Sequence, residues 1–267
     1  MRVGAASLRT GVDVPYVEQG RPEGVPLLLL HAWGESRHSF SRLMPRLDAA
    51  IHVFAFDQRG HRDAGKPATG YGLRDFSEDV TAFLDAVGVG SAVLLGSSSG
   101  GYVAQQVALD HPHRVRGLIL VGAPRSLAGR TPFADEVDAL ADPIDREWVE
   151  ASLRWFDFVQ PVPSAYLDDR VEDGVRMPAR VWRDALAGLS AAVPPTEAGT
   201  ITAPALVIHG ARDILVPVAE AEQLAARLSR SRLLVYEDAA HPVLWEHPDR
   251  IAHDVTEWIT ELTQQSA

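Results

Sequence analysis

The stretch Leu94-Leu95-Gly96-Ser97-Ser98-Ser99-Gly100-Gly101-Tyr102 joins a short apolar run to a segment with helical character. Residues 96–100 match the pattern Gly-x-Ser-x-Gly, with Ser98 at the centre. This pattern is typical of a very tight turn from a strand into a helix, which strains the central residue and leaves its side chain clear at the tip of a sheet. Glycine suits the flanking positions because it has no Cβ to collide with the backbone. The stretch therefore predicts a nucleophilic serine at position 98.

A pattern with only three fixed positions also arises by chance. The alternative interpretation is a Ser/Gly-rich loop in which Ser98 or Ser99 only caps the following helix. The surroundings favour the nucleophile, because a strand pattern precedes the motif at residues 92–95 and a helix pattern follows it at 102–109.

The composition is that of a globular enzyme. The chain has 267 residues, of which 46% are hydrophobic and 23% are charged, enough for one full core with room for an inserted subdomain. Its net charge of -11 argues against nucleic acid and against an anionic membrane surface as partners. The absence of cysteine excludes disulfides and a thiol nucleophile. Residues 1–20 lack a secretion-signal pattern and no run approaches the roughly 18 apolar residues of a membrane helix, so we expect a cytoplasmic protein.

Strand and helix patterns alternate along most of the chain. We expect strands at 12–18, 26–30, 51–56, 92–95, 118–121, 205–209 and 233–236, and helices at 40–47, 76–87, 102–109, 218–228 and 249–262. This order predicts an α/β fold with a mostly parallel central sheet and helices on both faces. The alternation stops between residues 125 and 200, where the sequence is helical and aromatic. We therefore expect a core domain of residues 1–124 and 201–267 with a helical cap subdomain of residues 125–200.

A serine hydroxyl becomes a good nucleophile when a base takes its proton, and the base is most often a histidine oriented by a carboxylate. Ten histidines compete for this role. His241 stands out because it directly follows the last predicted strand, and the carboxyl ends of parallel strands share the edge where Ser98 is expected. We predict that His241 is the base.

Asp213 is the predicted carboxylate, since it follows the strand pattern at 205–209. The alternative is a helix cap or a salt bridge to Arg212. Residues 122–131 contain no acidic side chain, which excludes that loop. Asp57 follows another strand, but the chain order Ser, Asp, His favours Asp213. Two fixed donors are also needed for an oxyanion, and we expect the backbone N–H groups of Ser99 and Trp33.

Taken together, these motifs resemble the α/β-hydrolase fold over essentially the whole chain. The resemblance is carried by His31-Ala32-Trp33-Gly34, Asp57-Gln58-Arg59-Gly60-His61, Gly96-Ser97-Ser98-Ser99-Gly100-Gly101, His209-Gly210-Ala211-Arg212-Asp213 and Ala240-His241. It implies a Ser98–His241–Asp213 triad, an oxyanion hole from Trp33 and Ser99, and a helical cap over the site. The chain departs from the usual family pattern at Ala32, Arg62 and Ala64, where glycine, glycine and serine are usual.

The activity implied is acyl transfer on a small-molecule substrate without a cofactor or metal ion. Trp148, Ser152, Trp155 and Val159 have the spacing of one helix face, and with Trp33 they favour an aromatic pocket. Trp33, Trp148 and Trp155 are the predicted substrate contacts, and a small, mostly uncharged ester or lactone is the predicted substrate. Other chemistry on the same triad stays open: carbon–carbon bond hydrolysis, hydroxynitrile lysis, perhydrolysis or cofactor-free oxygenation. A non-catalytic ligand receptor and a homo-oligomer also stay open.

Overall fold

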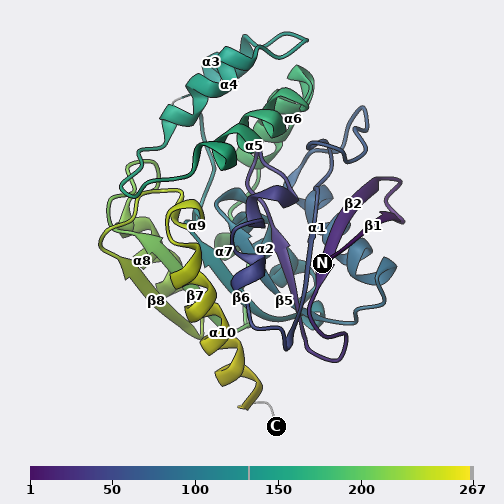
Figure 1. Ribbon diagram of the computed structural model, residues 1–267, viewed down its shortest axis with the longest axis vertical. Helices are drawn as coiled ribbons and strands as arrows, with labels where there is room; N and C mark the ends of the chain where they lie inside the picture. The colour runs from purple at the N-terminus through teal and green to yellow at the C-terminus, as the bar shows by residue number, and fades with distance from the viewer. Residues whose placement is uncertain (132, 265–267) are drawn as a thin grey trace.

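The computed structural model describes residues 1–131 and 133–264, and these form one mixed sheet with helices around it (Figure 1). The strands are β1 (Arg2–Ser7), β2 (Asp13–Gln19), β3 (Val25–Leu30), β4 (Ile51–Phe56), β5 (Ala92–Ser97), β6 (Val115–Val121), β7 (Ala205–Gly210) and β8 (Ser231–Tyr236). Their order is β1-β2-β4-β3-β5-β6-β7-β8. Strands β3 to β8 pair in parallel, and β1 and β2 add an antiparallel edge. The predicted α/β class is confirmed.

The central strands are continuous apolar runs because both of their faces are covered. In β3, Leu28 and Leu30 face one core and Leu27 and Leu29 face the other, as the two-residue period of a strand requires. The first core packs against α1 (Leu73–Ala86), α2 (Ser99–Asp110) and α8 (Val218–Arg227). The second core packs against short helices after β3 and against α9 (Val243–Glu246) and α10 (Pro248–Gln264).

Two details at the amino-terminal half differ from the expectation. The strand β1 was not predicted, although it pairs with β2 over its whole length. The helix expected at 40–47 is replaced by two 3-10 turns, η1 (Arg37–Phe40) and η2 (Met44–Arg46). Pro45 lies within this stretch and has no N–H for a longer helix, which explains the difference.

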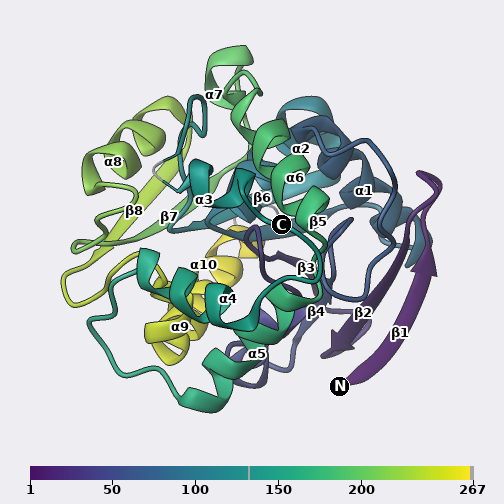
Figure 2. The same cartoon turned by 90° about the horizontal axis from the view of Figure 1, so that it is seen from above.

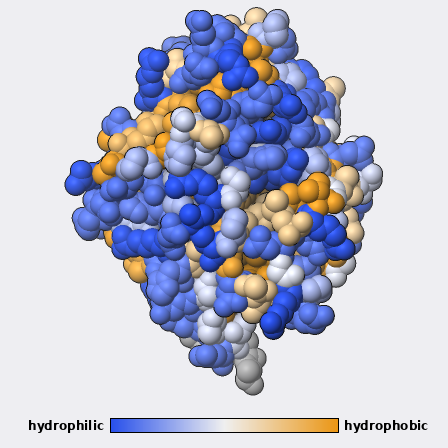
Figure 3. Space-filling view, viewed as in Figure 1, coloured by the Kyte–Doolittle hydropathy of each residue, from blue (hydrophilic) through white to orange (hydrophobic). Residues whose placement is uncertain are grey.

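The segment between β6 and β7 is helical and lies across one end of the sheet (Figures 1 and 2). It contains α3 (Ala134–Asp138), α4 (Arg146–Ser152), the 3-10 turn η4 (Leu153–Trp155), α5 (Ser164–Val175), α6 (Ala179–Ser190) and α7 (Pro195–Ala198). A further 3-10 turn, η3 (Pro112–Arg114), precedes β6. In Figure 3 the visible face of the molecule is mostly hydrophilic, and an apolar strip follows the region of α3 and α4. The division into a core domain and a cap subdomain stays a prediction.

The single helix face expected from Trp148 to Val159 is wrong. Trp148 lies on α4 and Trp155 on η4, but the helix ends there because Phe156 adopts an extended backbone. Val159 lies beyond the turn, where its N–H donates to the Glu246 carboxylate.

Candidate functional site

Ser98 lies at the turn between β5 and α2 with a left-handed backbone, at φ 48° and ψ -121°. Two flanking glycines make the turn sterically feasible. A Cβ at Gly96 would lie 2.4 Å from the Gly100 backbone, and a Cβ at Gly100 would lie 2.2 Å from the Leu30 carbonyl oxygen. Glycine is needed at both positions because α2 lies so close to the ends of β3 and β5 that a Cβ would collide with the backbone. The positive φ of Ser98 is a strained conformation for a residue with a side chain. The motif therefore forms the expected tight turn from a strand into a helix, which we call the elbow.

His241 and Asp213 reach Ser98 from two other loops at the same edge of the sheet. The His241 Nε2 atom lies 3.0 Å from the Ser98 Oγ atom, and His241 Nδ1 lies 2.7 Å from Asp213 Oδ2. The other carboxylate oxygen, Asp213 Oδ1, accepts the N–H groups of Leu215 at 2.9 Å and Val216 at 2.7 Å. The structure thus brings the three predicted residues into one continuous line of hydrogen bonds.

The contacts of His241 determine in which direction a proton can move. When His241 donates its Nδ1–H to the carboxylate, Nε2 is left as the acceptor for the Ser98 hydroxyl proton. The Asp213 and His241 side chains are buried, with exposures of 0% and 5%, so water screens their attraction only weakly. The arrangement can take the proton of Ser98 and stabilise the imidazolium that results.

His209 is a further member of this cluster, and the sequence motif that contains it gave it no role. Its Nε2 atom lies 3.4 Å from Asp213 Oδ2 and 2.8 Å from the Val216 carbonyl oxygen, to which it donates. Burial lowers the pKa of His209, which favours the neutral ring. His209 therefore fixes the loop that carries Asp213 without adding a positive charge. Its place at the end of β7 was the available signal.

The two predicted oxyanion donors differ in their present partners. The backbone N–H of Ser99 starts α2 and donates to no group in the described ranges 1–131 and 133–264. The backbone N–H of Trp33 instead donates to the Ser99 Oγ atom at 2.7 Å. One donor is thus free and the other is engaged.

A cavity of about 290 Å³ adjoins Ser98 and His241. Its apolar wall is an aromatic cluster in which Phe133 stacks on Trp155 at 4.3 Å and on Trp33 at 5.7 Å between ring centroids. Trp182 completes the aromatic cluster and meets Trp33 edge to face at 4.7 Å. Trp33 and Trp155 line the cavity, where a substrate could reach them. Their contact with a substrate stays a prediction.

Trp148 is not among the residues that line this cavity, and its predicted substrate contact stays a prediction. It packs edge to face against Trp155 at 5.6 Å and against Trp182 at 5.4 Å. The spacing of the residues correctly predicted a helix at Trp148. It could not predict that the Trp155 ring, and not the Trp148 ring, lines the cavity. Phe156, which the sequence did not assign to the site, stacks on the His241 ring at 5.4 Å.

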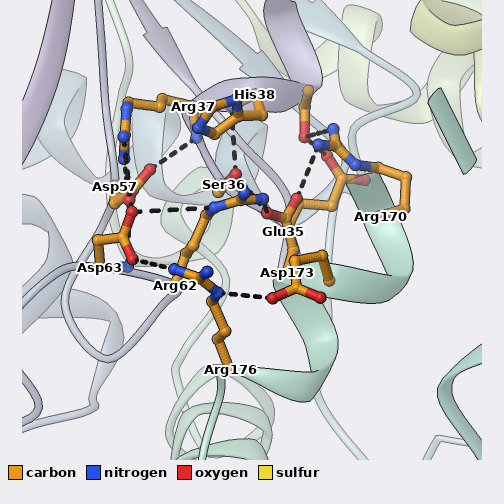
Figure 4. A network of polar contacts seen from close by, with 12 residues as sticks. Glu35, Ser36, Arg37, His38, Asp57, Arg62, Asp63, Arg170, Asp173 and Arg176 are labelled. Atoms are coloured by element: carbon orange, nitrogen blue, oxygen red, sulfur yellow. Dashed lines mark hydrogen bonds and ion pairs between the residues drawn. The ribbon is translucent and has the colours of Figure 1, made fainter. Parts of the chain in front are cut away.

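Charged residues also line the cavity, and among them Glu35 and Arg170 form a charged wall. Behind them lies an ionic network of Ser36, Ser39, Arg62, Arg170 and Asp173, which links the loops after β3 and β4 to α5 (Figure 4). Arg170 donates to Ser39 Oγ at 2.7 Å and lies 2.8 Å from the Asp173 carboxylate. Asp173 also accepts the Ser36 hydroxyl at 2.7 Å and pairs with Arg62.

Arg62 has a positive φ of 38°, an uncommon conformation for a residue with a side chain. The departure from the family glycine at this position is therefore accompanied by a specific contact, the ion pair with Asp173. Burial raises the pKa of Glu35, while the Arg170 guanidinium opposes that rise.

Outside the cavity, one group of side chains has the composition of a metal site. His253, Asp254 and Glu257 of α10 bring their ligand atoms within 4.8 Å of one another. Asp254 already accepts the Tyr236 hydroxyl at 2.5 Å, and groups of this kind are common on protein surfaces without an ion. The helices described in residues 1–131 and 133–264 are all too short or too polar to cross a membrane.

Comparison with known proteins agrees with this architecture. Residues 25–159 and 164–248 match the family described as alpha/beta hydrolase fold. A monoacylglycerol lipase of Mycolicibacterium smegmatis is 32% identical over 96% of this chain and 94% of its own length. A non-heme chloroperoxidase of Streptomyces lividans is 26% identical over 96% of this chain and 99% of its own length.

Among solved structures, a hydrolase from Pseudomonas aeruginosa PA01 superposes with a TM-score of 0.83 at 26% identity, covering 97% of this chain and 98% of that one. The family match extends over both halves of the sheet and over most of the helical segment between them. The chain therefore belongs to the alpha/beta hydrolase fold family and is an enzyme of the hydrolase type.

Proposed function

We propose that the protein hydrolyses a small, mostly apolar carboxylic ester or lactone through an acyl-enzyme on Ser98. The observation that carries the proposal is the hydrogen-bonded line from Ser98 through His241 to Asp213, which opens onto an aromatic cavity. The similarity to a monoacylglycerol lipase supports an ester as the substrate class.

In the proposed mechanism, His241 Nε2 takes the Ser98 proton while Ser98 Oγ bonds to the carbonyl carbon. The electron pair of the carbonyl double bond moves to oxygen, and donors at the start of α2 stabilise this oxyanion. His241 then protonates the leaving oxygen, and the bond between that oxygen and the acyl carbon breaks. Water, deprotonated by His241, then bonds to the acyl carbon. The bond from that carbon to Ser98 Oγ breaks, the acid leaves, and His241 returns the proton to Ser98. Asp213 holds the imidazole tautomer and stabilises the imidazolium throughout.

Cavity size limits the substrate. About 290 Å³ lies at the small end of the range for ligand pockets, which spans about 300–1,000 Å³. The stacked rings of the aromatic cluster offer flat apolar surface, and this favours a short acyl chain or a ring over a long flexible chain.

The test is labelling with a fluorophosphonate probe, followed by turnover of p-nitrophenyl esters of increasing acyl length. Wild type should label and should prefer short chains. Ser98→Ala should lose the label and several orders of magnitude in kcat. Ser97→Ala is the matched control for the loss of a hydroxyl, because Ser97 lines the same cavity but lies outside the line of hydrogen bonds, so this variant should keep the label and turn over within about tenfold of wild type.

Retained turnover in Ser98→Ala would contradict the assignment. Labelling without turnover of any ester would point to lactones or to another reaction of the same triad. A wild type that does not label at all would favour the receptor interpretation.

A further inference from the structure

The Ser99 side chain occupies the position where an oxyanion would meet the Trp33 N–H. Its Oγ atom lies 2.7 Å from the Trp33 nitrogen, within the 2.7–3.1 Å or so that an oxyanion donor spans. A carbonyl oxygen cannot occupy the same position. Either Ser99 turns away during the reaction, or its hydroxyl takes over the role of the donor.

The hydrogen bonding of Ser99 favours the second possibility. The Ser99 oxygen uses a lone pair to accept the Trp33 N–H, so the hydroxyl proton points elsewhere. That proton is donated to no acceptor in the part of the chain that the structure describes. Ser99 also lines the cavity, and it carries the free backbone N–H at the start of α2.

We propose that Ser99 supplies both donors of the oxyanion hole, its backbone N–H and its side-chain O–H, with the Trp33 N–H holding the hydroxyl in place. This inference rests on the proposed acyl transfer at Ser98. A hydroxyl that accepts one hydrogen bond is polarised and donates a stronger second one. Trp33 is then a positioning residue, and Ser99 is a catalytic residue that keeps its proton throughout.

The experiment compares kcat on one short p-nitrophenyl ester for wild type, Ser99→Ala and Ser99→Thr. Loss of an oxyanion donor should lower kcat of Ser99→Ala about a hundredfold with little change in KM. Ser99→Thr keeps the hydroxyl and should stay within about tenfold of wild type. Equal or faster turnover in Ser99→Ala would overturn the inference, because it would show that the hydroxyl only obstructs the Trp33 N–H.

A second readout separates an electrostatic role from a structural one. A trifluoromethyl ketone forms a covalent adduct with an activated serine, and carbon NMR follows the ionisation of the adduct oxygen. Ser99→Ala should raise the pKa of that oxygen by about one unit or more, whereas an unchanged pKa would contradict the proposal. Ser98→Ala separates a failure of the proposed function from a failure of this inference. Turnover that survives in Ser98→Ala overturns the acyl-transfer mechanism and this inference together. Normal turnover in Ser99→Ala alone overturns only this inference.

A different observation concerns the charged wall of the cavity. Glu35 Oε2 accepts the Ser39 hydroxyl at 2.5 Å, but Glu35 Oε1 accepts no hydrogen bond from the described residues. Arg170 is buried at 2% exposure, and its Nε–H is likewise without a hydrogen-bond partner there. Both residues line the cavity, and both contact the Ser39 hydroxyl, which donates to Glu35 and accepts from Arg170. An acceptor and a donor without partners therefore belong to the same side of the cavity.

We infer that this pair recognises a hydroxyl group on the substrate, and this too rests on the proposed ester hydrolysis. A hydroxyl can donate to the Glu35 carboxylate and accept from the Arg170 Nε–H, so it satisfies both groups at once, whereas a carboxylate has no proton to donate to Glu35 and an ammonium group has no lone pair for Arg170. Burying the pair beside a purely apolar ligand would leave Glu35 Oε1 and the Arg170 Nε–H without partners, which selects against that ligand.

Two matched substrate pairs test the inference and locate the hydroxyl. Glyceryl 1-monobutyrate and propyl butyrate differ only in hydroxyls on the alcohol side, and ethyl 3-hydroxybutyrate and ethyl butyrate differ only on the acyl side. Wild type should prefer the hydroxyl-bearing member of one pair by about tenfold or more in kcat/KM. Glu35→Gln should lower that ratio about tenfold, and Glu172→Gln on the outer side of α5 should leave it unchanged.

A wild-type ratio near one for both pairs would overturn the hydroxyl subsite while leaving ester hydrolysis intact. A ratio in Glu35→Gln equal to that of wild type would do the same. Failure of every ester, with no labelling of Ser98, would remove the proposed function and the subsite together.

Discussion

The loop at residues 31–39 meets the helical segment in two contrasting ways. Around Trp33 the contact is apolar, with rings of the aromatic cluster stacked at 4.3 to 6.4 Å. A few residues further on, Ser36 and Ser39 join the ionic network and bind Asp173 and Arg170 on α5. Both contacts bury this loop beneath the helices, but they depend on different physics.

The difference concerns what each contact requires from its partners. Apolar packing depends on volume and shape, so one apolar side chain can replace another at modest cost. A buried charge instead depends on a particular partner, because removing one member leaves the other without compensation. The aromatic cluster should therefore determine pocket size, and the ionic network should determine whether α5 stays attached.

The largest effect is expected for Asp173→Ala. This change leaves the guanidinium groups of Arg170 and Arg62, with side-chain exposures of 1% and 10%, without their shared carboxylate. The free energy of unfolding should fall by about 3–5 kcal/mol in urea titrations. Glu172→Ala is the control one residue away, where the ion pairs are half-exposed, and it should cost less than about 1 kcal/mol. Equal losses in the two variants would remove the contrast between buried and exposed pairs.

The next effect concerns pH, to which the aromatic cluster should be insensitive because it holds no titratable group. Near the ionic network, His61 is buried at 3% exposure and contacts His31 edge to face at 5.0 Å. Burial lowers the pKa of His61 to about 4 from an ordinary value of 6.5. Below pH 6.5 the unfolded chain binds a proton that the folded protein refuses, so stability is complete above pH 6.5 and is lost as pH falls towards 4.

The loss attributable to His61 should reach about 3 kcal/mol, from 1.36 kcal/mol for each pKa unit. The measurement is the difference in unfolding free energy between wild type and His61→Gln at pH 7, 5.5 and 4.5, which should shrink as the pH falls. Asp57 has the opposite sign, since burial raises its pKa to about 6, and taking the difference cancels its contribution. His113→Gln, at an exposed histidine, should leave the pH profile parallel to wild type. A parallel profile in His61→Gln would contradict the prediction.

The smallest effect is expected within the aromatic cluster. Trp155→Leu keeps an apolar side chain but loses the stacking on Phe133, so stability should fall by about 1–2 kcal/mol. The cavity should also enlarge, and the p-nitrophenyl ester profile should move towards longer acyl chains. A loss of unfolding free energy above about 3 kcal/mol would show that the aromatic cluster depends on particular partners as much as the ionic network does. An unchanged chain-length profile would show that the cluster does not determine pocket size.

The sequence was sufficient for features that depend on local pattern and on topology. Apolar runs gave the central strands, and the carboxyl ends of parallel strands must share an edge. That rule predicts that Ser98, Asp213 and His241 lie at one edge of the sheet, and the structure brings them within hydrogen-bonding range. The role of these residues in catalysis stays a prediction until Ser98→Ala is measured.

Features that depend on side-chain direction and distant pairing could not be predicted. Arg170 and Asp173 look like ordinary surface charges in the sequence, because their partners Ser39 and Ser36 lie more than a hundred residues away. The bond from Trp33 to Ser99 depends on one rotamer of a serine. Strand β1 could not be predicted because its sequence, Arg-Val-Gly-Ala-Ala-Ser, contains mostly small residues without a clear alternation, and its pairing with β2 is what orders it.

The helical segment lies in the chain between β6 and β7, and this position has a consequence for how such enzymes diversify. The chain leaves the sheet after β6 and returns to it at β7, and these strands are hydrogen-bonded neighbours. In the described strand pairing, residues 125–200 contribute to no ladder. Recombination could therefore exchange this segment between lineages while the strands, the elbow and the loops bearing Asp213 and His241 keep their register. New specificity could arise in one genetic event, provided that the incoming helices bring their own partners for Ser36, Ser39 and Arg62.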